Sequence, residues 1–526
     1  MNRNALLLIL AGFTYVAICL LPILKSGLYS DDLPNFQLKT IRADHNENAI
    51  ELALPGIEEW KAKGRYTPIS FILMEFAFKY FHSVFAYKTY IYLLNLLAVA
   101  VFLVYLSAIK FNVNKGIWLV CFGSVMQFRV EYHDAYTTFN GMYQMLFIFV
   151  FGSLIFYSYY LANRKHFFLG VSAIFFIISI LISEVGLLTI LLFPGSGLLL
   201  KIPYRKYLLS FIPYFFISLI YLSYVVWLKS HVLDQNVYTG LKTNIDLLAM
   251  TELLFKQLYA TIPLTNLQNT SAIPIKIFHQ ITDLKNLLSI IFIFFIGYLI
   301  FQRSKADQEN RLKNFELNYV LLAVALMILP AFFILPSSKY QLEIGWGRGY
   351  LPVYIQNFGT ATLLAYFFEY SFRNQRIANA RYAISFFIFI LVSTAITFLF
   401  NNALINSRSY RISFPADVLY KEVQNGILQN CREGSTIVLG NDFYWKSPDT
   451  YQALFKKITR KNFKVYDIGT NILFTDSSEC YLLECKPGKM VIVSLFKMDC
   501  SQNEIKILIK QKETPCDIDV IKEDGI

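Results

Sequence analysis

The acidic pair Asp31 and Asp32 comes only a few residues after the first long apolar stretch of the sequence. A carboxylate held beside a membrane can take a proton from an attacking hydroxyl group. It can also coordinate a cation, or do no more than solvate the end of a helix. The position of the pair leaves these three roles open.

A second group of ionisable residues combines Arg129 with Glu131, His133 and Asp134. Charged groups flanked by apolar helices are costly unless they pair with one another or have a function. This cluster is therefore either a structural network or part of a substrate site. On its own, His133 is more typical of a hydrogen-bonded structural residue than of a catalyst.

Four further charged residues stand in apolar, aromatic or glycine-rich surroundings. Glu184 lies between two apolar runs, where it either belongs to a site or caps the following helix. Arg348 lies among three glycines, which let a ligand approach the backbone, while its planar guanidinium suits phosphate oxygens. Arg65 follows Gly64 in the same way, and Lys339 is a second cation in the short loop of Arg348. The structural alternative for Arg348 is a snorkelling side chain at the membrane surface.

The composition around these residues is that of an integral membrane protein. Of the 526 residues, 56% are hydrophobic and 16% are charged, whereas about a quarter are charged in soluble chains. The net charge is +12, but the basic residues lie between apolar stretches and form no single basic face, so no nucleic-acid partner is expected. The phosphate-loop, dinucleotide, zinc-protease and serine-hydrolase signatures are all absent from the sequence.

Apolar stretches of nearly spanning length predict a polytopic α-helical protein with about eleven transmembrane helices in the lipid bilayer. Basic residues concentrate in alternate short loops, which predicts a cytoplasmic N-terminus and, with an odd number of spans, a C-terminus outside. The first stretch has no small-residue cleavage site after it, so we interpret it as a retained anchor. The stretches lie near residues 5–24, 88–109, 116–130, 143–161, 167–183, 185–200, 208–228, 287–302, 317–335, 350–369 and 382–401.

This orientation divides the chain into a membrane module, residues 1–401, and a soluble outer domain, residues 402–526. The outer loops of the module are 25–87, 131–142, 229–286 and 336–349, and the first contains an amphipathic segment suited to the membrane surface. A helical pattern followed by short β-rich runs predicts that the outer domain is a small α/β fold. Five of the seven cysteines fall in it, which indicates disulfides in an oxidising compartment, with one cysteine left over. Their spacing does not fit a zinc site.

The layout resembles the GT-C superfamily of membrane glycosyltransferases, whose first outer loop carries an acidic motif just after the first helix. The motifs Ser-Asp-Asp at 30–32 and Trp-x-x-x-Gly-Arg-Tyr-x-Pro at 60–68 are similar to those of the O-antigen-modifying glucosyltransferases of bacteria and their phages. The resemblance covers the membrane module; the cysteine-rich tail does not contribute to it.

The resemblance implies an inverting transfer of a monosaccharide from a polyprenyl phosphate donor to a hydroxyl group of a cell-envelope glycan. It would take place at the outer face of a bacterial inner membrane. Asp31 or Asp32, with Asp31 preferred, would be the general base, and Arg348 with Lys339 or Arg65 would stabilise the departing phosphate. A single leaving phosphate requires no metal, and no cofactor is expected. Residues that would line the acceptor side or orient the base are Glu131, His133 and Asp134.

Two other classes of protein fit many of the same features. A transporter or flippase of a lipid-linked sugar would also have many spans, but transporters often place charges near the membrane midplane. Here the charges gather at one face, which favours an enzyme. A non-catalytic scaffold subunit would present its soluble tail to a partner, and its outer acids would tolerate replacement.

Overall fold

The structure is a computed structural model, and the chain in it divides into two compact units. The first unit comprises Met1–Leu24, Asn48–Ala77 and Lys88–Leu404, and the second comprises Lys25–Glu47, Phe78–Tyr87 and Ile405–Ile526. The residues that the structure describes are 3–28, 32, 35, 48–81, 83–129, 134–232, 237–269, 280–306, 316–373, 380–408, 414–440, 448–467, 479–486, 490–499 and 506–517.

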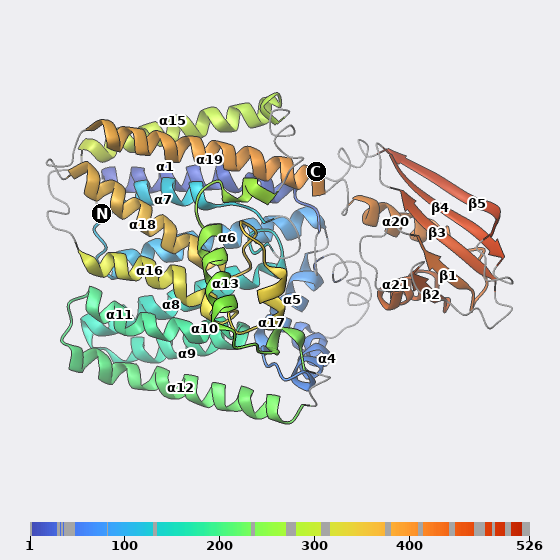
Figure 1. Ribbon diagram of the computed structural model, residues 1–526, viewed down its shortest axis with the longest axis horizontal. Coiled ribbons are helices and arrows are strands. Elements are labelled where there is room, and N and C mark those ends of the chain that lie inside the picture. Colours follow the sequence, from blue (N-terminus) through green and yellow to red (C-terminus); the bar gives the residue numbers. More distant parts are fainter. Residues whose placement is uncertain are drawn as a thin grey trace. The chain divides into compact units, whose positions relative to one another are not determined.

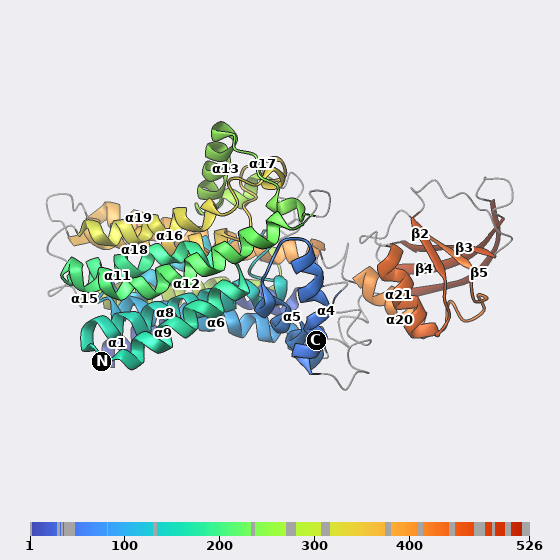
Figure 2. The ribbon, with the colours of Figure 1, turned by 90° about the horizontal axis from the view of Figure 1, so that it is seen from below.

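Helices form the first unit, and the longer ones run alongside one another (Figures 1 and 2). From the first half of the chain come α1 (Arg3–Leu20), α4 (Ala49–Ala62), α5 (Pro68–Tyr80), α6 (Val84–Ala108), α7 (Lys115–Val125), α8 (Met142–Asn163), α9 (His166–Ile182), α10 (Val185–Leu188), α11 (Leu192–Leu199) and α12 (Tyr204–Ser230). From the second half come α13 (Leu247–Ala260), α15 (Leu284–Ala306), α16 (Leu317–Phe332), α17 (Ser338–Glu343), α18 (Val353–Arg373) and α19 (Ala380–Arg408). Short 3-10 helices extend or join them: η1 (Leu21–Lys25), η2 (Phe139–Gly141), η3 (Thr189–Leu191), η4 (Thr239–Leu241) and η5 (Thr265–Asn269).

Six helical stretches within the described residues are long and apolar enough to cross a membrane, so the chain is a multi-pass helical membrane protein. The other five of the eleven predicted stretches contain shorter apolar helices or α18, and for them the crossing stays a prediction. The six are Leu6–Lys25, Val84–Ala108, Phe139–Asn163, Tyr204–Ser230, Leu284–Ser304 and Ile384–Ser407.

Helix α7 is one of the short helices, and protein surrounds it. Its residues from Gly116 to Val125 are all buried, and it packs against α1, α15 and α18. With 11 residues it is about 16 Å long, roughly half the thickness of the hydrocarbon core. Because its neighbours cover it, the chain can leave the helical conformation after α7 without exposing its backbone to lipid.

Aromatic rings fill the space around α7. Trp118 lies 5.1 Å from Phe102 of α6, and Phe147 of α8 stacks at 4.0 Å on Phe358 of α18, measured between ring centroids. The Trp118 indole donates a 3.0 Å hydrogen bond to Thr362, as a buried Trp requires. Part of the chain's high aromatic content therefore packs between helices and does not face lipid.

The second unit contains a five-stranded mixed sheet in the order β2-β1-β3-β4-β5 (Figure 1). Strand β1 pairs in parallel with β2 and β3. Strand β4 pairs antiparallel with β3 and with β5. Helices α20 (Phe414–Gln424) and α21 (Pro448–Thr459) share an apolar core with one sheet face. The small α/β fold predicted for the tail is confirmed. The strands are β1 (Thr436–Leu439), β2 (Lys464–Asp467), β3 (Cys480–Lys486), β4 (Met490–Asp499) and β5 (Lys506–Asp517).

Two of the five cysteines of the tail do not form the disulfides that the sequence predicts. Cys431 and Cys480 are buried and carry free thiols, so the disulfide expectation is wrong for both. Cys485 lies opposite Val493 of β4, and Cys516 lies opposite Val491 of the same strand. Strand β4 therefore separates these two cysteines by roughly 9–10 Å, beyond the reach of a disulfide. Cys500 lies outside the described residues.

Candidate functional site

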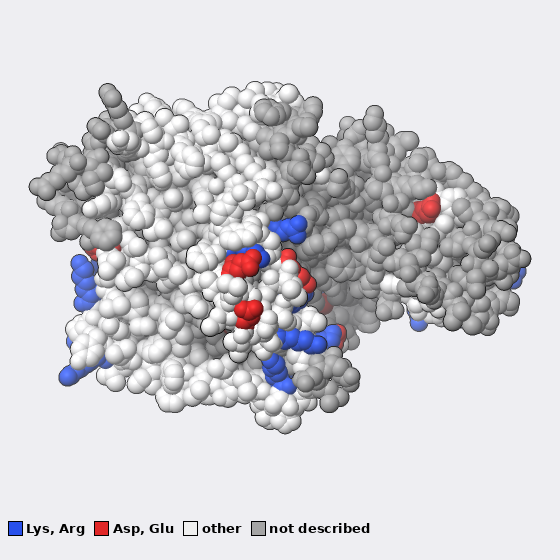
Figure 3. Space-filling view, in the orientation of Figure 1, with Lys and Arg blue, Asp and Glu red and all other residues white. Residues whose placement is uncertain are grey.

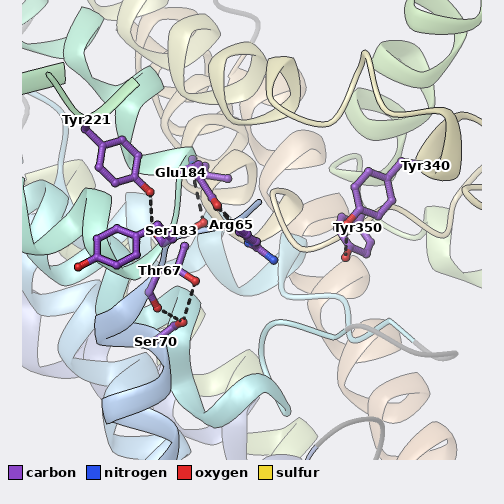
Figure 4. A network of polar contacts seen from close by, with 10 residues as sticks. Arg65, Thr67, Ser70, Ser183, Glu184, Tyr221, Tyr340 and Tyr350 are labelled. Carbon is purple, nitrogen blue, oxygen red and sulfur yellow. Dashed lines mark hydrogen bonds and ion pairs between the residues drawn. The ribbon is translucent and has the colours of Figure 1, made fainter. Parts of the chain in front are cut away.

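Arg65 and Glu184 form a bidentate ion pair between parts of the chain that lie far apart in the sequence (Figure 4). The Nε atom of Arg65 donates to Oε1 at 2.9 Å, and Nη2 donates to Oε2 at 3.0 Å. The Arg65 side chain is 24% exposed and that of Glu184 only 3%. Burial works against the charge of Arg65, but the Glu184 carboxylate more than offsets it and raises the pKa of the guanidinium.

A tight turn after α4 directs Arg65 toward its partner. Gly64 has a φ of 80°, a conformation that glycine adopts without strain. The backbone N–H groups of Gly64 and Arg65 donate to the carbonyls of Lys61 and Trp60, each at 3.0 Å. The sequence thus places a glycine where the chain must reverse, and Arg65 directly after it.

Glu184 stands at the start of α10, but its side chain does not cap that helix. The structural alternative considered for Glu184, a helix cap, is therefore wrong. The preceding residue, Ser183, has extended backbone angles and ends α9. This break between two apolar helices brings the Glu184 carboxylate to Arg65.

Two aromatic rings pack against the same guanidinium. The rings of Trp60 and Tyr238 are 4.8 Å apart, and Arg65 lies 5.2 Å from the first ring centroid and 5.7 Å from the second. Such contacts stabilise a cation and fix the plane of the guanidinium. Among the described residues, the Nη1 atom of Arg65 has no hydrogen-bond acceptor, since Glu184 engages Nε and Nη2. The guanidinium of Arg65 is therefore held in one orientation, and its Nη1 group can still donate a hydrogen bond to a ligand.

Tyrosine hydroxyls and a lysine complete this group. The hydroxyl of Tyr350 donates to that of Tyr340 at 3.2 Å (Figure 4), and burial raises the pKa of both phenols. Both hydroxyls therefore stay protonated at neutral pH, and the proton of Tyr350 is engaged with Tyr340. The ammonium group of Lys339 lies 5.8 Å from the Tyr238 ring and 5.9 Å from the Tyr340 ring.

The glycine-rich loop that carries Arg348 is fixed by another arginine, Arg129. The Nη1 atom of Arg129 donates to the carbonyl of Gly347 at 2.6 Å, and Nη2 donates to that of Ala260. The Arg348 side chain is exposed. Arg129 thus positions the loop, and Arg348 extends from it.

Asp134 has the contacts of a structural turn residue. Its carboxylate accepts from the backbone N–H of Tyr136 at 3.0 Å and from the hydroxyl of Thr137 at 2.9 Å. Burial raises its pKa to about 6, although these hydrogen bonds and the nearby Arg129 act in the opposite direction.

Side chains from neighbouring helices hold this turn through its carbonyl groups. Lys88 donates to the carbonyl of Thr137 at 2.6 Å, Asn95 to that of Tyr136 at 3.1 Å and Gln144 to that of Ala135 at 2.6 Å. For Asp134, the structure favours a role in a structural network over a role in a substrate site. Glu131 and His133 lie outside the described residues.

Asp32 belongs to the second unit and is fully buried. Its Oδ2 atom accepts a 2.8 Å hydrogen bond from the hydroxyl of Tyr87, and the Tyr87 ring stacks on Phe78 at 5.3 Å. Asp31 lies outside the described residues.

The structure therefore brings together three of the residues singled out from the sequence: Arg65, Glu184 and Lys339. The sequence analysis missed the aromatic partners Trp60 and Tyr238. The only signal for Trp60 was its place in the motif at 60–68, and Tyr238 is one of 35 tyrosines. Within the described part of the chain, no group of three or more potential ligands could hold a metal ion.

No family model matches the sequence, and no curated protein matches it either. The residues of the site are therefore the basis for a proposed function.

Proposed function

We propose that the protein is an inverting GT-C-type glycosyltransferase with eleven membrane spans. It transfers a monosaccharide from a polyprenyl phosphate to a hydroxyl group of an O-antigen-like envelope glycan. The reaction takes place at the outer face of a bacterial inner membrane, with the N-terminus in the cytoplasm and the C-terminal α/β domain in the periplasm. The observation that carries this proposal is the oriented, partly buried Arg65, held by Glu184 and enclosed by Trp60 and Tyr238.

This arrangement suits a phosphate leaving group. When the bond from the sugar C1 to the phosphate oxygen breaks, the electron pair goes to that oxygen and negative charge develops there. Pre-oriented donors stabilise such charge most when they need not reorganise during the reaction. Arg65 is fixed in this way, Lys339 supplies a second cation nearby, and Arg348 on its glycine loop would complete the phosphate ligands.

The acid pair at 31–32 would supply the base. The acceptor hydroxyl attacks C1 on the face opposite the phosphate, and its proton passes to the carboxylate of Asp31 or Asp32. A single displacement of this kind inverts the anomeric centre. The Tyr87–Asp32 hydrogen bond supports a positioning role for Asp32, so Asp31 is the preferred base.

The proposal is tested by comparing envelope glycans from cells with and without this gene by mass spectrometry. We expect loss of one hexose-sized increment, restored by the wild-type gene and not by Arg348→Lys. Arg205→Lys serves as a matched control, because Arg205 is an exposed arginine beside a tyrosine ring that the proposed site does not use. Unchanged glycans in the deleted strain would contradict the proposal.

A further inference from the structure

The first unit carries an apolar surface that the proposed reaction does not use. Four aliphatic side chains around the start of α13 and in α17 are exposed by 75–87%. We call them the apolar tip; they are Ile245, Leu247, Leu248 and Leu342. Several exposed apolar side chains on two neighbouring segments indicate a site of interaction, whereas single exposed apolar residues do not.

The segments that carry the tip are well folded, so its exposure does not result from loose packing. Asp246 caps α13 by accepting from the N–H groups of Leu248 and Ala249 at 2.9 and 3.2 Å. The two chain segments are joined by Asn244 N–H to Pro336 carbonyl at 2.7 Å and by Gln341 to Asn244 carbonyl at 2.9 Å. Behind the tip lies a small buried core of Leu253, Ile334, Leu335, Tyr340 and Ile344.

The tip stands on the flank of the helical bundle. Figure 2 shows α13 and α17 projecting beside the long helices of the first unit, within their length. Helix α13 packs on α16, which itself exposes Leu321 and Phe332. In a multi-pass membrane protein such flank residues face lipid, so the tip continues a lipid-facing surface.

The residues bordering the tip are aromatic or charged, as at the edge of a bilayer, and the charged ones include the exposed acids Asp246 and Glu343. Trp346 is half exposed and packs edge-on against Tyr259 at 5.7 Å, and Trp and Tyr concentrate at membrane interfaces. Lys242 is exposed next to the tip, where its ammonium group can meet a lipid phosphate. On the face shown in Figure 3, charged side chains gather over α13 and α17 and at the left-hand helix ends, while the described surface between is uncharged.

We propose that the apolar tip inserts into the membrane leaflet at the end of the bundle that carries Arg65 and Glu184. The element formed by α13 and α17 is then an interfacial anchor, with Trp346 and Lys242 at the level of the lipid headgroups. Lipid is favoured over a protein partner because the tip extends the flank of the same bundle. This inference does not depend on the proposed reaction.

Spin labelling of the full chain in phosphatidylcholine–phosphatidylglycerol nanodiscs tests the inference. Labels are placed at Leu248→Cys and Leu342→Cys, after every cysteine except the four buried free ones is replaced by serine. Collisions with oxygen, which dissolves in lipid, are compared with those of a water-soluble nickel chelate. Two labelled sites calibrate the scale: Leu321→Cys on the exposed apolar side of α16 and Glu58→Cys on the exposed polar side of α4.

We expect the oxygen-to-nickel collision ratio at Leu248 and Leu342 to exceed that at Glu58 severalfold and to approach that at Leu321. A nickel accessibility equal to that at Glu58 would show that the tip lies in water and would overturn the inference. Shielding from both reagents, while Leu321 still reports lipid, would show that a protein surface covers the tip and would overturn it as well.

Discussion

Arg65 and Glu184 are separated by 119 residues in the sequence, so their pairing fixes the loop after α4 against the turn between α9 and α10. Because both side chains are largely removed from water, the charge of each must be stabilised by the other. Removing one partner of a buried ion pair leaves the remaining charge buried without compensation, and this costs much more than losing a surface pair.

Glu184→Gln should therefore lower the free energy of unfolding by about 2–3 kcal/mol, below the full cost of breaking a buried pair because water partly screens Arg65. Denaturant unfolding in detergent measures the change. The matched control is Glu58→Gln, which removes the partner of Lys61 in an exposed pair at 3.3 Å and should cost less than about 1 kcal/mol. Equal effects of the two substitutions would show that the Arg65–Glu184 pair does not hold the fold.

The raised pKa of Asp134 predicts that the free energy of unfolding depends on pH. Its pKa in the folded protein is about 6, above its ordinary value, so the folded state binds the proton more tightly than the unfolded state. The stabilisation from this proton is complete below the ordinary pKa and is lost as the pH rises through about 6. Asp134→Asn lacks this titration. Between pH 4 and 7 the wild type should lose up to about 3 kcal/mol relative to the variant, and parallel pH profiles would contradict the prediction.

At the scale of elements, the loop from Gly345 to Gly349 depends on backbone conformations that favour glycine. Gly349 has a φ of 62°, and a Cβ atom there would lie 2.8 Å from Val353 and 2.9 Å from Ala260. Gly345 is different, because its added Cβ would meet only the flexible Arg348 side chain, at 3.5 Å.

Gly349→Ala should therefore displace the loop and reduce sugar transfer about tenfold or more, since left-handed backbone at an alanine costs about 1–2 kcal/mol before the clashes are added. Gly345→Ala is the control and should leave transfer nearly unchanged. Transfer rates at equal expression, with melting temperatures for both variants, make the comparison. Similar rates for the two variants would mean that the loop geometry does not matter for the reaction.

The same elements show how far sequence reasoning reaches. Glu184 is a candidate because a charge between apolar runs is costly, and Arg65 because a glycine precedes it as at Arg348, but nothing in the sequence indicates that the two pair. The burial of α7 could not be predicted, since a short apolar stretch looks alike whether lipid or protein surrounds it. Arg129 belongs to the second ionisable cluster predicted from the sequence, but its contacts with the carbonyls of Gly347 and Ala260 could not be predicted, because the sequence does not show where carbonyl groups lie.

At the scale of the whole molecule, the alternation of basic loops predicts a cytoplasmic N-terminus and an outer C-terminal unit. A periplasmic reporter fused after residue 408, where α19 ends, should be active. The same reporter inserted at Arg164, between α8 and α9, should be inactive, because that loop is predicted to face the cytoplasm. Activity at Arg164 and none after residue 408 would reverse the orientation and place the Arg65–Glu184 end in the cytoplasm.

Hydrophobic length was enough to predict a multi-pass protein, and six helices of spanning length confirm this class. The α/β fold of the tail followed from its change to short β-rich runs. The extent of the second unit did not follow from the sequence, because the described residues of 25–47 and 78–87 are grouped with the tail, far away in the sequence. The disulfide expectation is wrong for Cys431 and Cys480. Clustering in the sequence says nothing about strand order, and β4 separates Cys485 from Cys516.

The most direct test of glycosyl transfer uses the purified protein in nanodiscs with synthetic polyprenyl-phosphate monosaccharides and an envelope glycan acceptor. The wild type should form product with inverted anomeric configuration, read by nuclear magnetic resonance. The two acid substitutions should differ: the one at the base, with Asp31→Asn preferred, should lower the rate about 100- to 10,000-fold, and the other should only weaken transfer. Arg348→Lys should lower the rate about 100-fold or more, while Arg205→Lys should not change it. No transfer by the wild type, or near-normal transfer by both Asn variants and Arg348→Lys, would contradict the account.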